Sequence, residues 1–240
     1  MTTFDLSSST TPLSLRHSLS QAESSTHPHE REGARRLVNV LVAAIGLVVA
    51  APVMLLIAIA VKLSSRGPVF YTQTRIGLDM RTSNGGNHRR RVDLGGRPFK
   101  LYKFRTMRVA DDRDPAQVWA SQDDPRVTPI GKFLRVTRLD ELPQLWNVLL
   151  GQMNVVGPRP EQPQIFQTLR EEVTSYSLRQ RVRPGITGRA QIELHYDTCV
   201  DDVRKKVAAD LKYIESQSVA EDLRIMLLTA PAVLLRKGGW

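Results

Sequence analysis

The longest apolar stretch of the chain runs from Leu37 to Val61 and contains no charged side chain in 25 residues. At about 1.5 Å per residue in a helix, such a stretch can cross a hydrocarbon core of roughly 30 Å. Pro52 lies in its middle and removes a backbone hydrogen bond, so we expect a bend there. Basic residues flank the stretch on both sides, which favours a helix that enters a membrane, bends and returns to the same face. A buried core helix is the less favoured alternative, because globular cores seldom contain charge-free runs of this length.

The segment before this stretch has a different composition. Of its first 26 residues 13 are Ser or Thr, and they show neither helical nor strand periodicity. The pattern therefore predicts a disordered tail over 1–30, a re-entrant membrane helix over 31–66 that is kinked at Pro52, and a domain over 67–240.

The first part of the predicted domain alternates between strand and helix signals. Two β-prone runs, 69–74 and 98–104, are separated by a segment rich in Gly, Asn and Arg that predicts a long loop. Thr128-Pro129 is a helix-start signal for a helix up to about 138. A second helix is expected from about 140 to 150, and Pro143 requires it to begin at 139–141.

The remainder begins with two rigid Pro- and Gly-containing segments, 156–160 and 183–189. Two amphipathic helices are expected at about 200–215 and 219–235, and the second contains Pro231. Their pattern suits interfacial helices, although packing on the domain explains it nearly as well. The predicted fold class is α+β and predominantly helical, with a short β-hairpin, a kinked N-terminal membrane helix and amphipathic interfacial helices.

Composition narrows the class of partner. The formal net charge is +10, and nine Lys and Arg against one Asp lie between residues 81 and 108, which indicates anionic partners. A basic run beside a membrane segment is explained by lipid headgroups, so no nucleic acid is expected as a partner. Cys199 is the only Cys, which excludes an internal disulfide and a Cys-rich metal site.

The adjacent acids Asp140 and Glu141 are the main candidates for chemistry. The expected helix start places both carboxylates at the positive end of a helix dipole, where acids are common caps. A catalytic role is the alternative to this capping role. Arg135 and Arg138 precede the pair, and Arg159 follows it between two prolines. Carboxylates beside several Arg keep a low pKa and stay ionised, which suits a nucleophile or a metal ligand.

Other positions could bind an anion. The prolines around Arg159 fix its backbone and reduce the entropy lost when a guanidinium binds phosphate. Lys103 and Arg105 share one face of the second β-prone run, where surface charge is the plainer explanation. The Gly185–Gly188 loop either presents amides to an anion or turns the chain.

Other chemistries have no sequence support. The chain contains no Walker loop, no GxGxxG after a strand, no HExxH and no Cys/His pair at ligand spacing. His88 and His195 are isolated and are expected to be surface residues.

The motifs as a set resemble the bacterial sugar transferases, the monotopic polyprenyl-phosphate phosphoglycosyl transferases that start exopolysaccharide and glycan assembly. The block LDELPQLWNVL…GPRP is highly specific, and the resemblance runs in order from about Arg35 to the C-terminus. The matching stretches are SRGPVFYTQTRIG (65–77), GRPFKLYKFRTM (96–107), the block from 124 to 161, RVRPGITGRAQI (181–192) and DLKYIESQSVAEDLRIMLLT (210–229).

The resemblance implies a re-entrant anchor broken at Pro52 and a small, mainly helical domain on the cytoplasmic face of the bacterial inner membrane. It implies that Asp140 attacks the sugar-linked phosphorus of a UDP-sugar, releases UMP and carries a phospho-sugar. A polyprenyl phosphate, expected to be undecaprenyl phosphate, then takes the phospho-sugar.

The same resemblance assigns the site residues. Mg²⁺ is expected at Asp140, and Glu141 helps to hold the metal or to position the pair. Arg135 and Arg159 match family positions associated with phosphate binding. Lys103 and Arg105 belong to the family's YKFR block and are weaker candidates.

Three departures from the family pattern stand out. Ala51 replaces the Ser that commonly precedes the proline of the anchor, and the segment 78–95 is longer than the usual connection. Many members carry a Trp after RPGITG and an Arg-bearing segment shortly beyond it. Here those places hold Arg189 and the residues Glu193 to Tyr196, so the resemblance assigns no sugar or phosphate contacts to this region.

A membrane-tethered basic module that binds phosphate ligands or nucleic acid without turnover is the alternative function, and an inactive family member is a third. A binding module should tolerate Asp140→Asn, because Asn caps helices about as well as Asp.

Overall fold

The computed structural model describes residues 28–79, 95–108, 124–194 and 200–235. The predicted disordered tail up to residue 27, most of the basic loop with His88, and the pair His195 and Cys199 lie outside the described residues.

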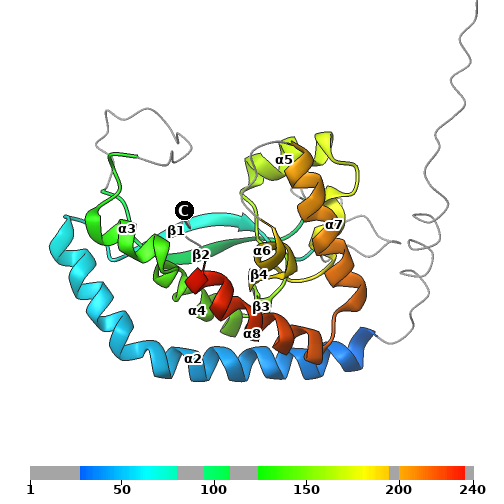
Figure 1. Ribbon diagram of the computed structural model, residues 1–240, viewed down its shortest axis with the longest axis horizontal. Helices are drawn as coiled ribbons and strands as arrows, with labels where there is room; N and C mark the ends of the chain where they lie inside the picture. Colours follow the sequence, from blue (N-terminus) through cyan, green and yellow to red (C-terminus); the bar gives the residue numbers. More distant parts are fainter. Residues whose placement is uncertain (1–27, 80–94, 109–123, 195–199, 236–240) are drawn as a thin grey trace, which may run out of the picture.

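A single long helix, α2 (Pro28–Ser64), contains the apolar stretch. It begins before the predicted residue 31, so residues 28–30 belong to the helix and not to the tail. Figure 1 shows α2 running along one side of the rest of the molecule and changing direction part-way along its length. Pro52 lies inside the helix and leaves one carbonyl without its amide partner, which is a sufficient cause for a bend.

One narrow face of α2 packs on the domain. Its buried positions follow a spacing of about four residues, starting with Arg35, Asn39 and Ala43 and ending with Ile57 and Val61. The rest of the helix is exposed and apolar, and only 11% of its most hydrophobic window is buried. The exposed large side chains are Leu37, Leu41, Ile45, Val48, Val49, Val53, Leu55, Leu56, Ile59 and Leu63. This exposure argues against the buried core helix, because core helices bury most of their apolar surface.

The two β-prone runs form the expected hairpin. β1 (Phe70–Ile76) and β2 (Pro98–Phe104) pair antiparallel, with Phe70 opposite Phe104 and Tyr71 opposite Lys103. Phe99, Leu101 and Phe104 of β2 are buried, whereas Lys100 is exposed and Lys103 is half-buried.

The helix after Thr128-Pro129 is present as predicted. α3 (Pro129–Val136) begins at Thr128, whose hydroxyl accepts a hydrogen bond from the Gly131 amide. Gly131 packs against the backbone of Thr106, where a Cβ would collide with the carbonyl oxygen.

The expected helix over 140–150 is wrong at its start. A 3₁₀ turn, η1 (Leu139–Glu141), is followed by a short helix, α4 (Gln144–Leu149), whose N-cap residue is Pro143. The two acids therefore lie in the 3₁₀ turn and do not cap an α-helix. The physical reason is Pro143, whose missing amide and fixed φ make it an entry residue, so the α-helix begins after it.

The two rigid segments are connected in a way that the sequence did not indicate. β3 (Asn154–Val156) and β4 (Gly185–Thr187) form a short parallel pair. A Cβ at Gly185 would lie within 2.1 Å of the Gly157 nitrogen, so only glycine allows this close approach. The Gly185 amide donates to the Pro158 carbonyl, which supports the turn-forming role over anion binding.

The remaining elements surround this pair. α5 (Pro163–Glu172), the 3₁₀ helix η2 (Tyr176–Arg181) and α6 (Arg189–Glu193) connect the strands and the C-terminal helices. The predicted amphipathic helices are confirmed as α7 (Val200–Ser216) and α8 (Val219–Leu235). The mainly helical composition, the hairpin and the long apolar helix of the predicted fold class are therefore present.

Both halves of α2 contact the domain. Near its start, Arg35 pairs with Asp222 of α8, and Asn39 accepts a hydrogen bond from the Val155 amide of β3. Near its end, Ile57 and Val61 belong to a core cluster with Phe104 and Leu134. The helix is thus attached to the domain near both of its ends.

Candidate functional site

The turn η1 places two adjacent carboxylates in the interior. Asp140 and Glu141 are 6% and 7% exposed, which is rare for acids unless they are paired. The side chains that face them come from β2, from the end of α3 and from the segment after β3.

Glu141 is the hub of this carboxylate cluster. Its Oε1 accepts hydrogen bonds from Lys103 Nζ and from Arg159 Nη2, each at 2.9 Å. Arg138 Nη1 lies 3.7 Å from the same oxygen. Although burial alone would raise the pKa of Glu141, Arg159 and Lys103 hold it well below its usual range.

Asp140 has much weaker contacts. Its Oδ2 lies 3.9 Å from Lys103 Nζ, and its Oδ1 is buried with no hydrogen-bond partner among the described residues. Burial raises the pKa of Asp140 above its ordinary value, and the charge of Lys103 opposes that shift. The prediction that both acids keep a low pKa is therefore right for Glu141 and wrong for Asp140, because the cations bond to Glu141.

The cations form the outer layer of the cluster. The side chains of Lys103, Arg138 and Arg159 are 19%, 29% and 36% exposed, whereas the two carboxylates beneath them are below 10%. An anion that approaches from solvent therefore meets positive charge first, and the carboxylates lie behind it.

Asn147 of α4 fixes the strand that carries Lys103. Its Oδ1 accepts from the Tyr102 amide at 3.1 Å, and its Nδ2 donates to the Lys100 carbonyl at 2.7 Å. The Asn147 side chain is fully buried and hydrogen bonds to the β2 backbone as a neighbouring strand would. These two hydrogen bonds fix the position of the strand that carries Lys103 relative to η1.

Two further arginines hold the backbone around Arg159. Arg179 of η2 donates to the Arg159 carbonyl at 3.2 Å, and Arg75 of β1 donates to the Pro160 carbonyl at 3.1 Å. Arg179 is itself paired with Asp210 of α7 at 2.7 Å. The Pro-Arg-Pro segment is thus fixed by hydrogen bonds as well as by its proline rings.

Two predicted phosphate ligands lie elsewhere. Arg135 donates from Nε to the Thr106 hydroxyl at 2.9 Å, and its neighbour Arg138 is the residue that reaches Glu141. Arg105 donates to the carbonyls of Val61, Ser65 and Arg66, at the end of α2. Arg105 therefore caps the C-terminal end of α2, in agreement with the preference of cations for helix C-termini.

Sequence reasoning missed Asn147, Arg75 and Arg179. Each acts on the backbone of a residue distant in sequence, so no local pattern reveals it. Arg75 and Asn147 do lie inside the stretches that carry the family resemblance, and this was the available signal.

The carboxylate cluster fits a divalent cation in one respect. Asp140 Oδ1 is a buried carboxylate oxygen without a partner, and Mg²⁺ is often bound by one or two carboxylates together with waters and substrate phosphates. No group of three or more His, Cys, Asp or Glu side chains is found within the described residues, so they offer no all-protein metal cage. Asp140 is the residue that fits the predicted magnesium ion.

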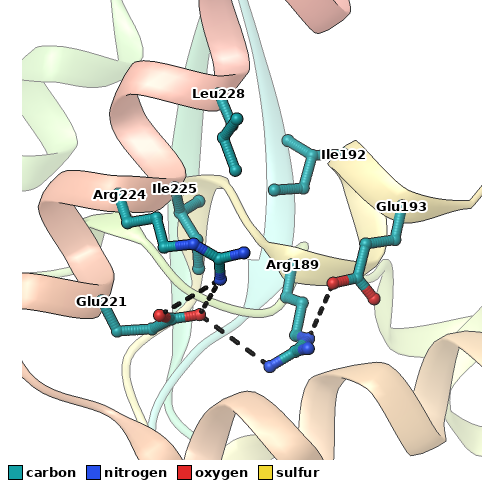
Figure 2. A pocket seen from close by; sticks show the side chains of 7 residues that line it. All are labelled: Arg189, Ile192, Glu193, Glu221, Arg224, Ile225 and Leu228. Carbon is teal, nitrogen blue, oxygen red and sulfur yellow. Dashed lines mark hydrogen bonds and ion pairs between the residues drawn. The ribbon is translucent and has the colours of Figure 1, made fainter.

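A separate pocket of about 250 Å³ lies between α6 and α8. Figure 2 shows Leu228 and Ile192 at one end of the pocket and Glu221 and Arg189 at the other. Arg189 lies 2.9 Å from Glu193 and 3.8 Å from Glu221, and Arg224 also pairs with Glu221. The pocket shares no residue with the carboxylate cluster, and its charges compensate one another.

The chain resembles several characterised proteins. It is 40% identical over 209 residues to the UDP-glucose:undecaprenyl-phosphate glucose-1-phosphate transferase of Klebsiella pneumoniae, covering 86% of this chain and 41% of that protein. It is 38% identical over 200 residues to the UDP-N-acetylgalactosamine-undecaprenyl-phosphate N-acetylgalactosaminephosphotransferase of Aeromonas hydrophila, covering 83% and 43%.

A shorter relative matches along most of its length. The exopolysaccharide production protein ExoY of Sinorhizobium fredii is 36% identical over 220 residues, which cover 86% of this chain and 88% of that protein. The chain spans only about two-fifths of the length of the Klebsiella and Aeromonas proteins. The family model described as bacterial sugar transferase matches residues 30–236, which include α2 from its third residue on and the whole carboxylate cluster. The chain therefore belongs to the bacterial sugar transferase family.

Proposed function

We propose that this chain transfers a hexose-1-phosphate from a UDP-sugar to a polyprenyl phosphate such as undecaprenyl phosphate, with release of UMP. The observation that carries the proposal is Asp140 Oδ1, a buried carboxylate oxygen beneath a layer of three cations, for which the described part of the chain supplies no hydrogen-bond partner. Such an oxygen is available to an electrophile, and the cations reduce its repulsion from phosphate oxygens.

The reaction has two steps. In the first, an oxygen of Asp140 bonds to the sugar-linked phosphorus, and the bond from that phosphorus to the bridging oxygen breaks, so UMP leaves with that oxygen. In the second, a phosphate oxygen of the polyprenyl phosphate attacks the same phosphorus and releases the Asp140 carboxylate. The product is a polyprenyl diphosphate sugar, and the configuration at the sugar carbon is unchanged.

The neighbouring residues have different tasks in this scheme. Glu141 holds Lys103 and Arg159 by two hydrogen bonds of 2.9 Å, so it orders the cations around the reacting group. Arg159 is the more exposed of the two and binds a phosphate of the donor. Asp140 would hold Mg²⁺, which supplies charge compensation for the phosphate groups when it is bound.

The contacts of α2 support a re-entrant anchor. A helix that crosses a bilayer carries one end to the opposite face, roughly 30 Å away from the other. Here Arg35 near one end and Val61 near the other both pack on the same domain. Both ends of α2 therefore lie on one face of the membrane, and its exposed apolar side chains enter the bilayer around Pro52.

Further apolar side chains lie on the domain surface. The exposed fractions of Phe133, Trp146 and Leu227 are 54%, 51% and 77%. They belong to α3, α4 and α8, and side chains of this kind suit the boundary between headgroups and acyl chains. We place the domain on the cytoplasmic face of the bacterial inner membrane, where a nucleotide-sugar donor is available.

The assay for this proposal is UMP release by the protein in nanodiscs. A panel of UDP-sugars is offered with Mg²⁺, with and without polyprenyl phosphate, and a parallel sample contains EDTA. The panel begins with UDP-glucose and UDP-N-acetylgalactosamine, since the relatives named above are described with these two donors. UMP formed in proportion to enzyme without acceptor and catalytically with it supports the proposal. No UMP from folded protein with any donor contradicts it and favours a binding module.

A further inference from the structure

Arg138 has an unusual backbone conformation for its residue type. Its φ is 58° and its ψ is 13°, and it is the only residue other than glycine with a positive φ in the described segments. The conformation is stabilised locally, because the Arg138 amide donates to the Arg135 carbonyl and the Arg138 carbonyl accepts from the Glu141 amide. This position directly after a helix is usually occupied by Gly, since a Cβ is strained there.

The side chain of Arg138 is the least tightly held of the three cations. Lys103 and Arg159 hydrogen bond to Glu141 Oε1 at 2.9 Å, whereas Arg138 Nη1 is 3.7 Å from that oxygen, which is beyond hydrogen-bond distance. The guanidinium is 29% exposed. Its planar set of donors is suited to bind two oxygens of one phosphate.

The charges of the cluster do not balance. Within the described segments two carboxylates, Asp140 and Glu141, face three cations, and the third cation makes a single, long ion pair there. An approaching anion therefore finds one positive charge that it can bind without breaking a hydrogen bond.

We propose that Arg138 binds a phosphate group of the reacting substrates beside Asp140, and that its strained backbone is retained because it directs the guanidinium to this place. The inference rests on the proposed function. The phosphate belongs either to the diphosphate of the nucleotide-sugar donor or to the lipid acceptor, and both present the same phosphate oxygens. Strain at a position that glycine could occupy without strain is typical of residues kept for function.

Arg138→Gly separates function from structure, because glycine adopts this φ without strain. We expect its melting temperature to equal or exceed that of the wild type, and its affinity for inorganic pyrophosphate with Mg²⁺ to fall about tenfold, measured by calorimetry in detergent. Arg204→Gln removes an exposed charge from α7 and should leave both values unchanged. Arg138→Lys should recover part of the affinity.

Kinetics then identify the source of the phosphate. If Arg138 binds the donor, Arg138→Gly slows UMP release without acceptor. If it binds the acceptor, that release is unchanged and the KM for polyprenyl phosphate rises. The proposal is overturned if the variant binds pyrophosphate and turns over within twofold of the wild type, if wild type binds no pyrophosphate, or if the variant melts well below the wild type. A wild type that binds pyrophosphate through Arg138 but releases no UMP contradicts the proposed function alone.

Discussion

Two buried charge clusters of this molecule are built differently. In the cluster between α2, α7 and α8, one cation meets one carboxylate, and both oxygens of Asp222 are used: Arg35 donates to one at 3.0 Å, and the Tyr213 hydroxyl donates to the other at 2.7 Å. In the carboxylate cluster, as far as the structure describes the chain, three cations face two acids and Asp140 Oδ1 has no hydrogen-bond partner.

The difference separates a structural role from a chemical one. A saturated cluster, in which every carboxylate oxygen already accepts a hydrogen bond, offers no free group to a ligand. The Arg35–Asp222 pair therefore only holds α2 to the domain. An unsaturated one has an energetic cost in the folded protein, since a buried oxygen without a partner has lost its hydration. That cost is recovered when a ligand completes the cluster, which is why unsatisfied buried groups are frequent at functional sites.

The largest effect is expected at Asp140. Asp140→Asn keeps the shape of the side chain and removes its nucleophilic charge, so UMP formation should fall by at least about a thousandfold. The melting temperature should not fall, because a poorly compensated buried charge is removed. Activity within tenfold of wild type would show that the unsaturated oxygen is not the reacting group.

The saturated cluster should give the opposite result. Arg35→Met leaves Asp222 as a buried charge without its cation, which lowers the free energy of unfolding by about 3–5 kcal/mol. The melting temperature, followed by circular dichroism in detergent, should fall by roughly 10 °C. Turnover per folded molecule should stay within about twofold of wild type. Arg204→Met, on the exposed face of α7, is the matched control and should melt as the wild type does. If Arg35→Met is stable but inactive, the Arg35–Asp222 pair takes part in the reaction, and the two clusters do not differ in role.

Glu141 lies between these extremes, because it is saturated but belongs to the reactive cluster. Glu141→Gln removes the charge that orders Lys103 and Arg159, so turnover should fall about ten- to a hundredfold through misplaced cations. Glu193→Gln is the matched control. Glu193 belongs to α6 and lines the pocket between α6 and α8, so this variant should keep full activity. Equal activities of the two variants would mean that the cations need no carboxylate to order them.

The smallest effect concerns Asp124, a carboxylate in the turn before α3. Hydrogen bonds from the Arg126 side chain and amide hold the pKa of Asp124 at about 2, below its ordinary value of 3.8. Because the folded-state pKa is lowered, this stabilisation is present above about pH 4 and is lost as the pH falls toward 2. Asp124→Asn should therefore lower the melting temperature slightly at pH 6, and the difference from wild type should narrow with acidification. A constant difference would assign the effect to the shape of the turn.

The sequence predicted those elements whose signals are local. The charge-free stretch, the alternating runs of the hairpin, the Thr128-Pro129 start and the two amphipathic C-terminal helices each occupy a continuous window with one periodicity. The parallel pair β3–β4 was missed because strands of three residues are too short for a period, and its partners are about 30 residues apart.

The candidate site was predictable by residue type but not by arrangement. Asp140, Glu141, Arg159 and Lys103 come together as expected, since they share the motifs of one family. Arg105 and Arg135 bond instead to the end of α2 and to Thr106, and their phosphate-binding role stays a prediction. The left-handed backbone at Arg138 was hidden, because Arg gives no signal for a position that normally requires glycine.

The central claim is that the buried carboxylate of Asp140 becomes covalently bonded to phosphorus. The most direct measurement is the intact mass of the protein after incubation with Mg²⁺ and its UDP-sugar in the absence of acceptor, followed by peptide mapping. The account predicts one equivalent of UMP, a mass gain of one sugar phosphate on the peptide that contains Asp140, and its loss when polyprenyl phosphate is added. UMP formation only in the presence of acceptor, or a sugar phosphate on another residue, would contradict it.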